Sequence, residues 1–98
     1  MSDMQGVTVG RIVHYVLNVE DVRRIYEHRR SENINGNPIH DGVHVPAMIT
    51  QVFEDEFGEG QHGVNLKCFL DGDDMYWSVS RRHDEEKAPG TWHWMEKA

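Results

Sequence analysis

The segment Val64–Arg81 constrains the fold more than any other part of the chain. It contains two stretches of alternating apolar and polar residues, VNLKCFL and MYWSVSR, separated by the turn-forming sequence DGDD. Alternation with a period of two is typical of a strand that buries one face, and Asp-Gly between two such stretches indicates a β-hairpin. The sequence therefore predicts an antiparallel hairpin over residues 64–81.

The alternation also predicts which hairpin side chains face the core. With a turn at Gly72-Asp73, Phe69 stands opposite Tyr76, and a shift of two residues would leave the faces unchanged. The side chains expected to face inward are Val64, Leu66, Cys68, Leu70, Met75, Trp77 and Val79. Those expected to face outward are Asn65, Lys67, Phe69, Tyr76, Ser78 and Ser80.

Three more segments have the composition of strands. Val7–Leu17 has Gly10 as a bend and a mostly apolar alternate face, expected to be buried, formed by Val7, Val9, Val13, Tyr15 and Leu17. Residues 43–53 alternate with Val43, Val45, Ala47, Ile49 and Phe53 on one side. Thr91–Met95 predicts a short last strand with Trp92 and Trp94 on one side and His93 on the other. The connections at 33–42, 54–63 and 82–90 are rich in glycine or charge, which predicts exposed loops.

One helix is expected from about Val19 to about Glu32. Asn18 stands at the N-cap position, acids follow in the first turn, and arginines stand near the end, which suits the helix dipole. The apolar residues of the segment, Val22, Ile25 and Tyr26, form a narrow stripe that fits against a sheet. The order of elements predicts a mainly β (α+β) fold. We expect an SH3-like or OB-like barrel of four to five strands, with the helix after the first strand, in a single domain over residues 1–98.

Composition narrows the function classes. The chain has 98 residues and a formal net charge of −7, so it lacks the basic surface typical of nucleic-acid binding, and we expect no nucleic-acid partner. No apolar run approaches a membrane span, and Met1–Gln5 lack the pattern of a signal peptide. We therefore expect a cytoplasmic protein with no membrane contact. The single cysteine, Cys68, excludes an internal disulfide and multi-cysteine zinc sites.

The spacing of the histidines and the position of the cysteine do not indicate a metal site or a catalytic nucleophile. His40 and His44 are four apart, but the turn sequence Asp41-Gly42 between them excludes a helical ligand pair. We expect these histidines and His14 to be ordinary surface or loop residues, with a metal site as the alternative. Cys68 is expected to point inward, where a thiol is usually inert. We predict no catalytic residue, no metal and no cofactor.

The outward hairpin face is the candidate ligand site. Phe69 and Tyr76 would form a stacking platform for a base or another planar group, with Lys67 and Ser78 to meet its polar edge. Arg29 or Arg30 of the helix would receive a phosphate, and His93 would help to hold the ligand. The alternatives are that the helix or a second subunit covers this face, and that the arginines are a solvated surface.

Three stretches carry a resemblance to known proteins. GRIVHYVL (10–17), Val64-Asn65-Leu66 with Phe69-Leu70-Asp71-Gly72 and Trp77, and Pro89–Trp94 resemble a family of small proteins encoded by tailed phages and prophages. The similarity covers the strands and the terminal motif and departs in the helix and in loops 33–42 and 54–63. The resemblance implies a phage product acting in the cytoplasm of a bacterial host, without implying an activity.

These observations lead to three hypotheses. The first is a non-enzymatic, homo-oligomeric binding protein that counters host defence by sequestering a nucleotide-like signal molecule. The second is a protein-interaction module, either a virion component, an inhibitor of a host protein or a DNA mimic, that docks through its acidic loops at 54–59 and 84–86. The third, and the least favoured, is a small hydrolase with a histidine-bound metal.

Overall fold

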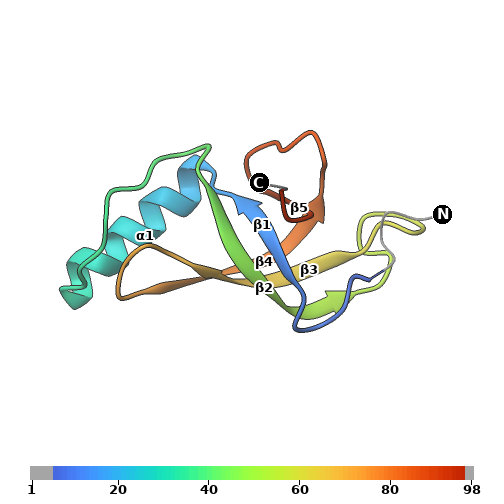
Figure 1. Ribbon diagram of the computed structural model, residues 1–98, viewed down its shortest axis with the longest axis horizontal. Coiled ribbons are helices and arrows are strands. Elements are labelled where there is room, and N and C mark those ends of the chain that lie inside the picture. Colours follow the sequence, from blue (N-terminus) through green and yellow to red (C-terminus); the bar gives the residue numbers. More distant parts are fainter. Residues whose placement is uncertain (1–5, 97–98) are drawn as a thin grey trace.

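The protein folds as a closed five-stranded barrel with one helix, as a computed structural model that describes residues 6–96 shows (Figure 1). The predicted fold class, a small SH3-like or OB-like barrel with a helix after the first strand, is confirmed. The elements are β1 (Ile12–Val16), α1 (Val19–Glu32), β2 (His44–Phe53), β3 (Gly63–Phe69), β4 (Met75–His83) and β5 (Thr91–His93). Met1–Gln5, in which we found no signal-peptide pattern, lie outside the described residues.

The strands follow one another around the barrel in sequence order. β1 to β4 form an antiparallel meander, and β5 closes the barrel by pairing antiparallel with β1 and parallel with β4. The closing strand has only three residues, and its pairings join His14 to His93 and Tyr15 to Trp92. Closure leaves no long sheet edge within residues 6–96 for another chain to extend. No helix in this part of the chain is long and apolar enough to cross a membrane.

Alternate residues of the strands fill the barrel. The side chains with no exposed surface include Val13, Tyr15, Ala47, Ile49, Val64, Leu66, Cys68 and Trp92. Because successive strand residues point to opposite faces, their neighbours lie on the outside of the barrel. The inward position predicted for Cys68 is confirmed, and burial raises the pKa of its thiol to about 12.

Helix α1 begins and ends where its capping residues predict. The Asn18 side chain accepts a hydrogen bond from the Asp21 N–H at 2.7 Å, and the Asp21 carboxylate accepts one from the Asn18 N–H at 2.9 Å. This reciprocal pair is a capping box. At the other end Asn33 adopts the left-handed conformation that commonly ends a helix. The helix lies at one end of the barrel, beside the loop between β3 and β4 (Figure 1).

β5 ends at His93, two residues earlier than predicted, and β1 and β2 differ from the prediction in the side chains that they bury. β1 begins at Ile12 because the chain turns at Gly10, whose φ is +95° and whose N–H donates to the Ile49 carbonyl at 2.7 Å. Val9, which was predicted to face the core, is therefore exposed. In β2 a bulge between Ile49 and Gln51 shifts the alternation, so that Phe53 is exposed instead of buried.

The faces predicted for the second hairpin strand are wrong. Cys68 pairs with Tyr76 and Phe69 pairs with Met75, so the connecting loop has five residues, Leu70–Asp74, instead of a two-residue turn. An odd change in loop length exchanges the two faces of a strand. The core therefore receives Tyr76 and Ser78, whereas Met75, Trp77 and Val79 are exposed.

Candidate functional site

The outside of the barrel carries a continuous row of side chains across four strands. Register pairs Ile12 of β1 with Met48 of β2, Met48 with Lys67 of β3, and Lys67 with Trp77 of β4. The two ends of this row differ in exposure. Ile12 and Met48 are partly buried, whereas Lys67 and Trp77 are exposed to solvent.

The exposed end of this row widens into an apolar surface over β3 and β4. We call it the outer sheet face and define it by Lys67, Phe69, Met75, Trp77 and Val79. The apolar members are 37% to 59% exposed, and Trp77 is the most exposed of them. Contiguous exposure of large apolar side chains is uncommon on soluble domains and marks sites of interaction. The predicted outward positions of Lys67 and Phe69 are therefore right, and the second aromatic residue of the face is Trp77.

Phe69 also lines a groove beside the outer sheet face. The groove has a volume of about 390 Å³ and lies between the loop that follows α1 and the outside of β2 and β3. Its walls are mostly apolar and include Ile39, Val43, Pro46 and Phe69, and His44 also lines it. A concave apolar site of this size is within the range of small-ligand pockets.

Tyr76 belongs to a buried polar cluster and is unavailable for stacking. Its hydroxyl donates to Asp21 Oδ1 at 2.6 Å, and the Tyr15 hydroxyl donates to Asp21 Oδ2 at 2.5 Å. Burial raises the pKa of both phenols, and the hydrogen bonds to Asp21 raise it further. The predicted outward pair of Phe69 and Tyr76 is therefore wrong.

Ser78 lies in the same cluster. Arg81 donates from Nε to Ser78 Oγ at 2.6 Å and from Nη2 to Asp21 Oδ1 at 3.2 Å. Asp21 is fully buried, and it accepts hydrogen bonds from two phenols, one guanidinium and the Asn18 N–H. Because the carboxylate is saturated with donors, the cluster fastens the start of α1 to the barrel. Ser78, predicted to meet a ligand edge, is a structural residue.

Arg29 is likewise committed to the fold. Its guanidinium binds Asp74 with two hydrogen bonds, Nε to Oδ2 at 2.8 Å and Nη2 to Oδ1 at 3.1 Å, and also donates to the Asn37 carbonyl. Both side chains of the ion pair are buried, and Asp74 raises the pKa of Arg29. The predicted phosphate role of Arg29 is wrong because a buried carboxylate already occupies the guanidinium. Arg30 is exposed on the next helix position.

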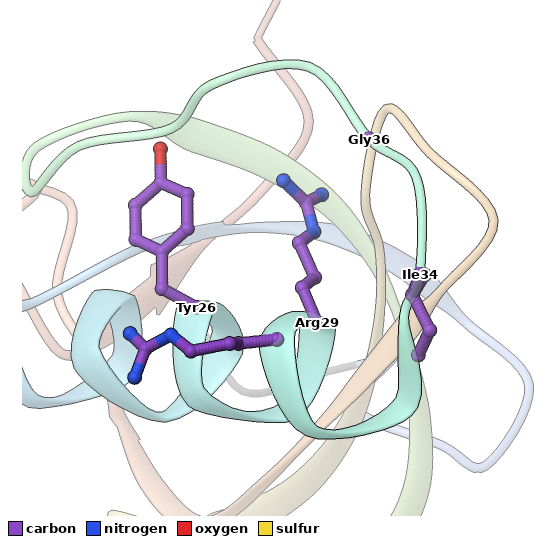
Figure 2. Close-up of a pocket in the computed structure, with 5 residues that line it drawn as sticks. Tyr26, Arg29, Ile34 and Gly36 are labelled. Atoms are coloured by element: carbon purple, nitrogen blue, oxygen red, sulfur yellow. The ribbon is translucent and has the colours of Figure 1, made fainter.

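A shallow pocket of about 360 Å³ lies where Arg29 meets the loop after the helix (Figure 2). Tyr26 and Arg29 rise from α1 toward the loop that carries Gly36, and Ile34 closes one end. The Tyr26 hydroxyl is also engaged, because it donates to the Ile39 carbonyl and accepts from the Ile39 N–H. The polar groups of Tyr26 and Arg29 therefore serve internal contacts.

Gly36 permits the approach of Arg29. A Cβ at Gly36 would stand 2.4 Å from the Arg29 guanidinium, and one at Gly72 would stand 2.6 Å from Gly36 Cα. The two glycines form a β-bridge between the helix–β2 loop and the β3–β4 loop. Glycine at both positions therefore lets two loops meet over a buried ion pair.

His93 lies on the side of β5 opposite Trp92, as predicted, but it is fully buried. Its Nε2 lies 3.1 Å from Glu96 Oε1, and burial lowers the pKa of the imidazole. Its Nδ1 has no hydrogen-bond partner among the described residues. His14 and His44 contact the same Glu96 oxygen, and they lie on β1 and β2 instead of in loops. His14, His93 and Glu96 are the group within residues 6–96 with the donor arrangement of a metal site.

Some carboxylates of the acidic loops accept hydrogen bonds from the backbone. Asp55 accepts from the Gly60 N–H, Asp84 accepts from the Glu86 N–H, and Glu85 accepts from the Trp94 N–H. His40 contacts the carbonyl of the neighbouring Asp41. These contacts give Asp55, Asp84, Glu85 and His40 a role in local structure. They do not favour the acidic loops as a docking surface.

No protein-family model matches the chain, and neither the curated proteins nor the solved structures include a significant match.

Proposed function

We propose that this protein is a non-enzymatic binding protein that holds a planar, anionic, nucleotide-like molecule on its outer sheet face. The observation that carries the proposal is the position of Lys67 beside two exposed aromatic side chains. Lys67 stands opposite Trp77 on the neighbouring strand, and Phe69 follows two residues later on the same face. A cation beside exposed aromatic rings is the arrangement that binds bases by stacking and phosphates by charge.

The net charge of the chain favours a small ligand over a long nucleic acid. A formal charge of −7 repels a polyanion, whereas one or two phosphates need only a local cation such as Lys67. The groove beside Phe69 offers a concave apolar wall for the base. The phage setting implied by the sequence resemblance makes sequestration of a host signal nucleotide, in the host cytoplasm, the physiological role that we propose.

Calorimetric titration with a panel of mononucleotides and cyclic dinucleotides tests this proposal. Phe69→Ala and Phe53→Ala form a matched pair, because both phenylalanines are 37% exposed and only Phe69 belongs to the outer sheet face. We expect Phe69→Ala and Trp77→Ala to weaken binding about fivefold or more, since stacking contributes ~1–3 kcal/mol per base. Phe53→Ala should bind as the wild type does. Absence of binding to every nucleotide, or equal losses in the matched pair, would contradict the proposal.

A second candidate function is association with a protein, including a second copy of this chain. The width of the outer sheet face favours this association, because Met75 and Val79 extend the exposed apolar surface beyond what one base would cover. Sedimentation velocity over a range of concentrations tests self-association. A homo-oligomer would sediment faster as concentration rises, and Trp77→Glu would restore the monomer. Concentration-independent monomers would exclude the second copy as the occupant.

A further inference from the structure

Three histidines from three strands meet at one carboxylate oxygen on the outside of the barrel. Glu96 Oε1 lies 3.2 Å from His14 Nδ1, 2.8 Å from His44 Nδ1 and 3.1 Å from His93 Nε2. His14 comes from β1, His44 begins β2 and His93 ends β5. The register pairs His14 directly with His93, so closure of the barrel is what brings the imidazoles together.

We propose that His14, His44, His93 and Glu96 bind one divalent transition-metal ion of the zinc class. The donor atoms of His14, His93 and Glu96 all lie within 4.8 Å of one another, so small side-chain movements would bring them around a common centre. His44 supplies the fourth donor, because its Nδ1 already contacts the same carboxylate oxygen. The inference is independent of the function proposed for the outer sheet face.

The packing of the rings supports a common centre. The His93 ring is 4.9 Å from the His44 ring and 5.7 Å from the His14 ring between centroids, both in edge-on arrangements. The ring faces therefore do not stack, and one nitrogen of each ring contacts Glu96 Oε1. His93 is fully buried, whereas His14 is about one-quarter and His44 one-third exposed, so an ion could enter from the side of His44.

The second oxygen of Glu96 has a partner of its own. Lys87 contacts the other oxygen, Oε2, at 3.3 Å and leaves Oε1 directed at the histidines. Glu85 is a further acidic group acting on His93.

The donor set distinguishes among metal classes. Imidazole nitrogens with one carboxylate suit Zn²⁺, Co²⁺ or Ni²⁺, whereas Mg²⁺ and Ca²⁺ prefer sites made of oxygen. Three histidines and one glutamate would complete a four-coordinate zinc site, which is typical of structural centres. The ion would fasten the three-residue β5 to β1 and β2 and so strengthen the closure of the barrel.

Isothermal titration of the chelator-treated full chain with ZnCl₂ tests the inference, with thermal unfolding as a second readout. We expect one Zn²⁺ per chain, a higher Tm in its presence, and no response to Mg²⁺. His14→Ala and Glu96→Gln should weaken binding by more than about tenfold. His40→Ala is the matched control, since His40 is exposed and lies outside the group.

Two results would overturn the inference. One is a folded wild-type chain that binds no stoichiometric Zn²⁺ in the titration. The other is Zn²⁺ binding that His14→Ala and Glu96→Gln leave unchanged, or that only His40→Ala removes. Because the side chains of His14 and Glu96 are partly exposed, His14→Ala and Glu96→Gln are expected to remain folded, which circular dichroism would verify.

Discussion

The two faces of the β3–β4 hairpin differ from the usual pattern in opposite ways, because polar side chains are buried on the inner face and apolar side chains are exposed on the outer face. On the inside, Tyr76 and Ser78 belong to a hydrogen-bonded cluster centred on a buried carboxylate, Asp21. On the outside, Phe69 and Trp77 are exposed. The polar interior is satisfied by internal partners, whereas the apolar exterior has surface left to bury. The comparison separates residues that hold the fold from residues that can meet a ligand.

The largest effect is expected from removing the centre of the buried cluster. Asp21→Ala would leave two phenol hydroxyls and the Arg81 guanidinium without their acceptor in the interior. We expect a loss of more than about 3 kcal/mol in the free energy of unfolding, measured by urea denaturation. Asp73→Ala, on an exposed carboxylate, is the control and should change stability little. A small effect at Asp21 would show that the cluster does not hold the helix.

A slightly smaller loss is expected at the ion pair between the helix and the hairpin loop. Arg29→Met would leave Asp74 buried without its partner, which costs about 3 kcal/mol or more. The double variant Arg29→Met/Asp74→Leu removes both charges and should recover part of that loss. Urea denaturation of the two single variants and the double variant measures the coupling. Additive losses would contradict a direct interaction between the two side chains.

Trp77 should contribute little to stability, in contrast with its buried neighbour Tyr76. Trp77→Thr keeps a residue that favours strands and is expected to change the free energy of unfolding by less than about 1 kcal/mol. Tyr76→Ala in the same assay should be strongly destabilising, because Tyr76 is buried and bound to Asp21. Equal losses from the two substitutions would place Trp77 in the core and remove the contrast between the faces.

The smallest effect is expected from chemical modification of Cys68, which tests whether the core of the barrel is accessible to a reagent. Burial raises the pKa of its thiol to about 12, so the thiol stays protonated at pH 8 to 9 and the reactive thiolate is scarce. We expect alkylation by iodoacetamide to be slow in native protein and fast in urea, as followed by mass spectrometry. Alkylation at the same rate in both conditions would mean that this part of the barrel opens readily.

The parts of the fold that depend on local sequence could be predicted. Helix α1 matched its predicted bounds because Asn18 and Asp21 form a capping box within four residues of chain. The barrel followed from alternating segments and turn residues. The register of the hairpin could not be predicted from local sequence. The length of its loop depends on the distant Arg29, which binds Asp74 in the interior. A charged residue at the end of a turn could equally well have been exposed.

The candidate site was predictable only in part, for the same reason. Phe69 and Lys67 precede the loop, so their outward positions did not depend on its length. Tyr76 follows the loop and was assigned to the wrong face, which placed Trp77 in the core by mistake. The grouping of His14, His44 and His93 requires the closure of the barrel by β5. No local spacing in the sequence indicates that these three residues meet.

We propose that the outer sheet face binds a nucleotide-like ligand, whereas the buried cluster around Asp21 stabilises the fold. Two-dimensional NMR of backbone amides during titration with the nucleotide panel tests this division. We predict saturable shifts concentrated at Lys67–Phe69 and Met75–Val79, with none along helix α1. A folded protein whose spectrum does not respond to any nucleotide, or whose shifts centre on α1, would contradict the account.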